Sequence, residues 1–216
     1  MKIYFRRSVS ALSEISNFAV AAKRAAIPNC WAFIDGTARA ICRPSEDQET
    51  YYSGHKKFHC VKYESVVTPD GLTVSLMGAF EGQRHDAGIF RESGFYGQLE
   101  EKARFKNSQY IIFGDQAYGI RELLLCPYPG HGLNGAQQQS NATITPIRQA
   151  VEWSFSKLLA EFAFVDFKKN QKLLLQDIEG FYKTATICNY LIAIHVCMAI
   201  KRQHISMLLP FLLSNI

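Results

Sequence analysis

Two short apolar runs in this chain each lead directly into an aspartate: CWAFIDGT at residues 30–37 and YIIFGD at residues 110–115. Runs of this length predict buried strands. We expect the first strand to end at Asp35, with residues 38–43 as an extension, and the second to end at Asp115. If the two strands are neighbours, both carboxylates meet beyond the strands' carboxyl ends, where open α/β sheets form their sites.

The sequence between these runs predicts a β-hairpin. Its strands are expected at about 58–67 and 72–80, because the turn Thr68-Pro69-Asp70-Gly71 has proline at its second position and glycine at its fourth. Residues 44–57 are polar and predict a loop before the hairpin.

Helical spacing of apolar residues marks most of the remaining chain. Helices are expected at residues 10–26, 85–102, from about 146 onward and at 172–203, with a long loop at 127–141. The third helix presents an apolar stripe made of Val151, Phe155, Leu158 and Phe162. A hairpin followed by alternating helix and strand indicates an α/β fold with a mixed sheet and flanking helices.

The composition fits one ordinary domain of 216 residues. Lys and Arg number 24 against 19 Asp and Glu, a mild basic excess that is compatible with a polyanionic partner. The six cysteines include no CxxC pair, so we expect free thiols in a reducing compartment. The most apolar run, residues 187–200, is too short to span a bilayer, and no membrane partner is expected.

Four acids are candidate site residues. Asp35 and Asp115 follow the two buried strands. Glu152 borders the apolar stripe of its helix, where a solvated ion pair with Arg148 is the alternative. Asp86 is either the cap of its helix or a further metal ligand.

Carboxylates held close together repel one another unless cations neutralise them. Oxygen-only ligands suit Mg²⁺ or Mn²⁺ rather than zinc. Two such ions activate a nucleophile and stabilise the leaving oxygen of a phosphodiester. The acids are therefore compatible with phosphodiester cleavage, although strand-end aspartates alone are a weak signal.

The sequence motifs that contain these acids are a more specific signal than the spacing between the acids. Five blocks follow one another: FIDGT at 33–37, YSGHKK at 52–57 with Lys62-Tyr63, GQRHD at 82–86, FGDQAY at 113–118 with Pro127-Tyr128, and residues 148–155 with Val151-Glu152.

Together these blocks resemble those of harbinger-type transposases, which belong to the DDE superfamily of endonucleases and have an RNase H-like fold. Joint occurrence in the family's order makes the resemblance specific, where a single block would be weak. The resemblance implies a metal-dependent DNA endonuclease or transposase with catalytic Asp35, Asp115 and Glu152. It also implies that these three acids hold Mg²⁺ or Mn²⁺, with Asp86 as an additional ligand.

Two features depart from the family's pattern. Only about 29 residues precede the first block, where the family usually carries a helical DNA-binding region, and Ser156 stands where it usually has glycine. The alternative function is therefore a catalytically inactive, domesticated or truncated transposon-derived protein that binds DNA or protein. All the expected catalytic acids are nevertheless present.

A basic block, His55-Lys56-Lys57, precedes the hairpin. The resemblance suggests that these side chains contact DNA phosphates, and a solvated loop is the alternative. His55 and His59, with Cys60 adjacent, also suggest zinc. Zinc is disfavoured because the segment that holds His59 is expected to be a strand, so the two histidines would not share a helical face.

The expected division of the chain is an N-terminal helical segment at 1–29, an RNase H-like DDE endonuclease domain at 30–203 and a C-terminal tail at 204–216. The implied partners are DNA, a separate DNA-binding protein and a second copy of the chain in a homodimer. DNA as substrate implies the nucleus, with the cytoplasm as an additional compartment.

Overall fold

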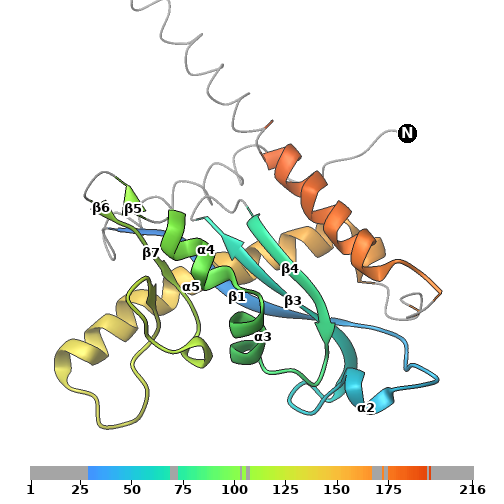
Figure 1. The fold of residues 1–216 in the computed structure, drawn as a ribbon, viewed down its shortest axis with the longest axis horizontal. Helices are drawn as coiled ribbons and strands as arrows, with labels where there is room; N and C mark the ends of the chain where they lie inside the picture. Colours follow the sequence, from blue (N-terminus) through green and yellow to red (C-terminus); the bar gives the residue numbers. More distant parts are fainter. Residues whose placement is uncertain are drawn as a thin grey trace, which may run out of the picture.

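The computed structural model describes residues 29–68, 73–102, 104–105, 108–166, 172, 175–193 and 195. The expected helix 10–26, the centre of the hairpin turn and the tail 204–216 lie outside these residues. In the described part of the chain, one mixed sheet lies between helices on its two faces (Figure 1).

Six of the described strands form the main sheet: β1 (Cys30–Ala40), β2 (Tyr52–Ser53), β3 (Phe58–Val67), β4 (Thr73–Glu81), β7 (Ile111–Phe113) and β8 (Leu124–Leu125). The central order is β4-β3-β1-β7-β8, and β2 pairs with the start of β3. β3 is antiparallel to both β1 and β4, whereas β1, β7 and β8 are parallel. This mixed sheet with flanking helices is an RNase H-like arrangement, as expected.

The expected hairpin is confirmed as β3 and β4. His59 lies in β3, as expected, and therefore shares no helical face with His55. The loop expected at 44–57 is partly wrong, because it contains α2 (Gln48–Tyr51) and β2. These elements are too short to leave a hydrophobic period in the sequence.

The first strand does not end at Asp35 but continues into the expected extension, which reaches Ala40 rather than residue 43. β1 continues to Ala40 because β3 pairs with it from Phe33 to that residue. On its other side β1 pairs with β7 only as far as Phe33, opposite Phe113. Asp35 therefore lies inside β1, yet beyond the last residue of its parallel neighbour.

The helix expected at 85–102 is two helices, α3 (Asp86–Glu92) and α4 (Phe95–Lys102). Ser93 and Gly94 separate them, and Gly94 has a φ of 65°, a left-handed conformation that ends helices and favours glycine. Both helices lie on one face of the sheet, in front of β1 in Figure 1.

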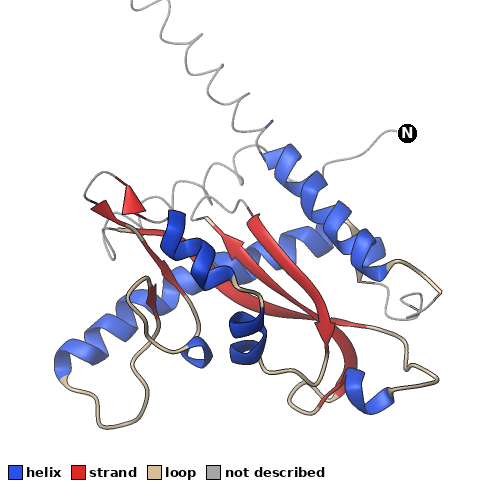
Figure 2. Cartoon of the chain, viewed as in Figure 1, coloured by secondary structure: helices blue, strands red, loops and turns tan. Residues whose placement is uncertain are grey.

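The opposite face is covered by α5 (Gly135–Glu161), which lies behind the sheet in Figure 2. The helix begins at Gly135, so the expected loop 127–141 is too long and the expected start near Pro146 is wrong. The cause is a capping box: the Asn134 side chain accepts the N–H of Gln137, whose side chain accepts the N–H of Asn134.

A further helix covers residues 178–193. It starts later than the expected residue 172, because the Asp177 carboxylate accepts the N–H of Gly180 and caps the first turn. No helix in the described residues has the length and apolar content to cross a membrane. The remaining short elements are β5 (Arg104–Phe105), β6 (Ser108–Gln109), η1 (Gln116–Tyr118) and η2 (Ala163–Val165).

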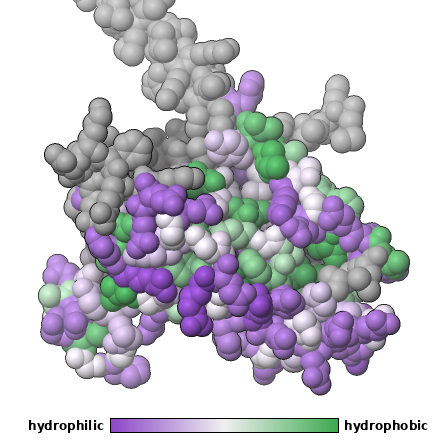
Figure 3. Space-filling model, in the orientation of Figure 1, coloured by the Kyte–Doolittle hydropathy of each residue, from purple (hydrophilic) through white to green (hydrophobic). Residues whose placement is uncertain are grey.

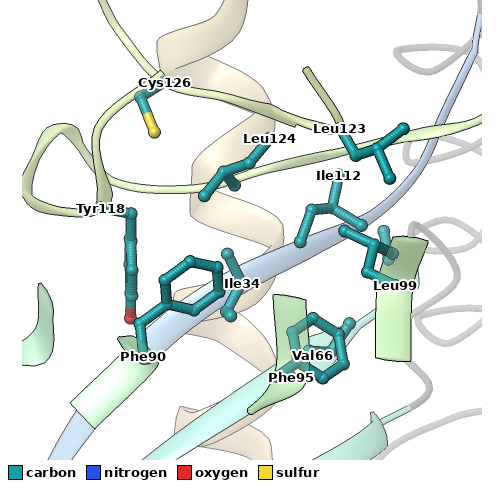
Figure 4. Close-up of a cluster of buried hydrophobic side chains, with 11 residues drawn as sticks. Ile34, Val66, Phe90, Phe95, Leu99, Ile112, Tyr118, Leu123, Leu124 and Cys126 are labelled. Atoms are coloured by element: carbon teal, nitrogen blue, oxygen red, sulfur yellow. The ribbon is translucent and has the colours of Figure 1, made fainter. Parts of the chain in front are cut away.

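One apolar layer joins the sheet to α3 and α4. Ile34 and Val66, which pair across β1 and β3, belong to the same buried cluster as Phe90 of α3. Tyr118 stands beside Phe90 in this cluster, and its hydroxyl points away from Cys126 (Figure 4). None of the five cysteines of the described residues is part of a disulfide.

A second apolar layer joins the sheet to α5. Phe33 and Phe113 pack against Phe155, and Leu158 lies in a neighbouring cluster with Tyr63. Phe155 and Leu158 belong to the stripe expected for this helix, so that part of the stripe is confirmed. The outer surface around α3 is largely hydrophilic, with apolar residues in small groups (Figure 3).

Gly82 is expected to be a site where any side chain is costly. A Cβ there would lie 2.3 Å from the Tyr51 carbonyl oxygen and 2.6 Å from that of Cys60. Gly82→Ala should therefore lower the free energy of unfolding by about 2–4 kcal/mol. Gly97→Ala, on an exposed part of α4 with nothing within 4 Å, should be neutral or stabilising by up to about 1 kcal/mol. Urea unfolding followed by circular dichroism measures both, and equal stabilities would contradict the close contact.

Candidate active site

Asp35 and Asp115 lie on neighbouring strands. Phe33 of β1 stands opposite Phe113 of β7, so each aspartate is two residues beyond a paired position. Because the strands are parallel, both acids reach the same edge of the sheet. The neighbour relation that the sequence required is confirmed, and the catalytic roles stay a prediction.

Backbone amides orient both carboxylates. The N–H of Gly36 donates to Asp35 Oδ1 at 2.9 Å, and the N–H of Gln116 donates to Asp115 Oδ1 at 2.6 Å. Asp115 is thereby the N-cap of η1, which leads to Tyr118. The backbone thus holds each carboxylate in a defined orientation.

Asp86 reaches the same region from α3. His85 is the N-cap of α3 and Asp86 is its first residue, so the expected capping role of Asp86 is wrong. Lys62 draws the carboxylate toward β3 instead, since its Nζ donates to Asp86 Oδ1 at 3.1 Å and to the Arg84 carbonyl at 2.5 Å. A Cβ at Gly36 would lie only 3.1 Å from Asp86 Cγ, so the carboxyl occupies the place of a side chain there.

Glu64 is a buried acid of this region that the sequence analysis did not single out. Its side chain is 1% exposed, and neither carboxylate oxygen has a hydrogen-bond partner among the described residues. Burial, and then the charge of Asp86, raises the pKa of Glu64 from 4.5 to about 8. The acid is therefore mostly protonated at neutral pH.

The pKa of the Tyr118 hydroxyl is affected by the acids around it. It is buried and has no hydrogen-bond partner in the described part of the chain. Burial raises the pKa of this phenol, and four carboxylate charges raise it further, in the order Glu64, Asp35, Asp86 and Asp115. Four acids from β1, β3, α3 and the end of β7 thus act on one buried hydroxyl.

Glu152 is exposed on α5, one helical turn before Phe155. Phe155 packs against Phe33 and Phe113, so Glu152 approaches the sheet face that also carries Asp35. Among the described residues, no three Asp, Glu, His or Cys side chains form a group that could hold a metal ion. The role of Glu152 as the third acid therefore stays a prediction.

The basic block is separate from these acids. His55, Lys56 and Lys57 are exposed in the turn between β2 and β3. Asp35 pairs with Ser65, further along β3, so the turn lies about 20–25 Å away at about 3.3 Å per residue. A contact between these side chains and DNA would therefore lie away from the acidic edge.

Side chains alternate between the two faces of a strand, and this alternation identifies Glu64 as an unusual residue of β3. Glu64 shares a sheet face with Val66, two residues later, and Val66 is in the core. Acids on the buried face of a central strand are rare and mark candidate functional groups. Tyr118 has no comparable signal, because its surroundings come from residues far away in the sequence.

We expect the free energy of unfolding to fall as the pH rises from about 5 to about 8. The folded-state pKa of Glu64 is about 8, above the usual 4.5, so its contribution is fully present below pH 4.5 and is lost as the pH rises through 8. Glu64→Gln, which is always neutral, should remove this slope and be more stable than the parent above pH 8, by on the order of a few kcal/mol.

Urea unfolding in EDTA at pH 5, 6.5 and 8 measures this slope. Glu100→Gln makes the same change on the exposed side of α4 and should keep the parent's slope. A parent-like slope in Glu64→Gln would show that other groups control the pH dependence.

Comparisons with known proteins identify the family of this chain. A family described as DDE superfamily endonuclease matches residues 34–196. "Protein ALP1-like" from Arabidopsis thaliana is 26% identical over 149 residues, which is 63% of this chain and 36% of that protein. The chain thus spans about a third of this curated relative's length, and no solved structure matches it significantly. Because the family match covers most of the sequence, this chain belongs to the DDE superfamily of endonucleases.

Proposed function

We propose that this chain is the catalytic domain of a divalent-metal-dependent DNA endonuclease or transposase. The observation that carries the proposal is the delivery of Asp35 and Asp115 to one sheet edge by two neighbouring parallel strands. Membership of the DDE endonuclease superfamily supports the reaction class, the cleavage of phosphodiester bonds.

The acids fit a hard divalent cation such as Mg²⁺ or Mn²⁺, because every donor is a carboxylate oxygen. Asp35 and Asp115 would share the cation, Glu152 would complete a second site, and Asp86 is a further candidate ligand. Carboxylates repel one another until a cation neutralises them. We therefore expect side-chain rotations, rather than backbone movement, to bring the acids together.

The cations, when bound, would activate the attacking water or DNA 3′-hydroxyl and stabilise the leaving oxygen. The chain's own part is positioning. The amide that follows each aspartate orients its carboxylate, and the β1–β3 ladder holds Asp35 rigidly. Glu152 approaches from α5, so the packing of Phe155 against the sheet sets its distance from the aspartates.

DNA would extend from the acidic edge toward the turn that carries His55, Lys56 and Lys57. At about 3.4 Å per base pair, a separation of about 20–25 Å corresponds to roughly six or seven base pairs. These side chains would thus contact phosphates at a distance from the cut and would position the duplex rather than read its sequence.

Partners and compartment are part of the same proposal. A separate DNA-binding protein would supply sequence specificity, a second copy of the chain would form a homodimer, and action on DNA places the protein in the nucleus, with the cytoplasm as an additional compartment. The mild basic excess and the family support DNA as the partner.

A DNA- or protein-binding role without cleavage is the second candidate function. Two observations favour it: Glu152 is exposed, and no three potential ligands are gathered among the described residues. The two candidate functions differ in whether the carboxylates of Asp35 and Asp115 are required for activity on DNA.

Asp35→Asn and Asp115→Asn should each reduce Mn²⁺-dependent nicking of plasmid DNA by at least about a hundredfold, because each removes an anionic ligand while keeping the side chain's shape. Asp166→Asn, an exposed aspartate just after η2, should cut as the parent does. Retained cutting by Asp35→Asn would contradict the assignment. A parent that binds DNA equally in EDTA and never cuts it would support the second candidate.

Replacing Lys56 and Lys57 with glutamine should weaken DNA binding to a similar extent for all sequences. Each lost phosphate contact reduces the magnitude of the slope of log K against log salt by about 0.9. The slope of the double variant should therefore be smaller than the parent's by about 2. Lys183→Gln, on the helix 178–193 and ion-paired with Glu179, is the control. Fluorescence anisotropy over a salt series measures the slope, and an unchanged slope would place the DNA elsewhere.

A further inference from the structure

We propose that Glu64 is a further cation ligand of the acidic region, together with Asp86 of α3. This inference rests on the proposed function, because it takes the bound group to be a divalent cation. It adds a residue from β3 to a site otherwise built from β1, α3, α5 and the end of β7.

Glu64 is buried without a partner. Its side chain is 1% exposed, and both carboxylate oxygens lack a hydrogen bond within the described residues. Lys62 lies two residues earlier on the same face of β3, and its ammonium group donates hydrogen bonds to the Asp86 carboxylate and to the Arg84 carbonyl. Buried acids are normally paired or bound to metal, since an unpartnered one is destabilising. A bound cation would supply the partner.

Glu64 also stands at the right place. It lies opposite Gly36 in the antiparallel ladder, where facing Cβ atoms are about 4.5–5.5 Å apart. Gly36 has no side chain, and the Asp86 carboxyl fills that position, with its Cγ 3.1 Å from where a Cβ would be. The carboxyl groups of Glu64 and Asp86 thus flank one glycine, next to Asp35 in the chain. One cation, with oxygens at about 2.1 Å, could bind both.

The register of β3 shows on which side of the sheet the Glu64 carboxyl lies. Glu64 and Val66 lie on the same face of β3, and Val66 packs with Phe90 of α3. Glu64 therefore lies on the α3 side of the sheet, where the Asp86 carboxyl covers Gly36. The two carboxyl groups thus share one face.

Mn²⁺ titration calorimetry on the purified chain tests the inference. Glu64→Gln removes the anionic ligand, and we expect the Kd for Mn²⁺ to rise by at least about tenfold. Glu64→Asp withdraws the carboxylate by one methylene and should raise the Kd several-fold, roughly. Glu100→Gln, the same change as Glu64→Gln but on exposed α4, should bind as the parent does. Asp35→Asn should lose binding, as the proposed function requires.

The outcomes separate Glu64 from the rest of the site. Weaker binding in both Glu64 variants with parent-like Glu100→Gln supports the inference. Parent-like Mn²⁺ binding by Glu64→Gln, or by Glu64→Asp if the glutamine variant does not fold, overturns the role of Glu64. If Asp35→Asn loses binding in the same experiment, the proposed cation site at Asp35 still stands. An Mn²⁺ affinity that is absent from the parent, or unchanged in Asp35→Asn, overturns the proposed cation site and the role of Glu64 together.

Thermal unfolding gives a second readout that a space-filling acid would not move. Bound ligand stabilises the fold by RT ln(1 + [L]/Kd), so a tenfold rise in Kd removes about 1.4 kcal/mol at high Mn²⁺. We expect Glu64→Gln to have a Tm at or above the parent's in EDTA and a smaller rise on adding Mn²⁺. Equal rises in the two proteins would contradict ligation by Glu64.

Discussion

The backbone ladder between β1 and β3 is the constraint on which the acidic region depends. It holds β1 from Phe33 to Ala40, whereas the ladder to β7 stops at Phe33. Asp35 is therefore fixed on one side by a strand partner and borders the end of a shorter strand on the other. Its neighbour Gly36 faces α3 while Asp35 faces α5, because side chains alternate along a strand. One short stretch of β1 thus gives the helices of both faces access to the same edge.

The concentration of negative charge here needs compensation, and the described residues supply little of it. Four carboxylates act on the Tyr118 hydroxyl, while Lys62 is the cation seen to bond one of them, Asp86. Protonation of Glu64 at neutral pH, caused by its burial, lowers the total charge further. The backbone amides that follow Asp35 and Asp115 offset part of the rest. A bound cation would neutralise the negative charge that these groups leave uncompensated.

Local patterns in the sequence predicted the sheet well and the helix limits poorly. The apolar runs before Asp35 and Asp115 predicted β1 and β7, and the proline–glycine turn predicted the hairpin of β3 and β4, because these signals are short-range. The extension of β1 beyond Asp35 was expected, but its exact end at Ala40 is set by pairing with β3, which no local pattern reveals. The break at Gly94 and the capping box at Asn134 were readable signals, since both residues are typical of helix ends. The candidate aspartates could be named in advance, but the placement of Asp86 over Gly36 depends on tertiary contacts.

Glu64 is the residue hardest to explain by stability alone. A buried hydroxyl without a partner among the described residues also occurs at Ser65, but a neutral hydroxyl loses much less on burial than a carboxylate does. A sequence selected only for a stable β3 would carry an apolar residue here, as at Val66 on the same face. Retaining an acid against that cost is expected where its charge is used, and strained or destabilising choices concentrate at functional sites. The position opposite Gly36, on the same face as the Asp86 carboxyl, is where such a charge has a use.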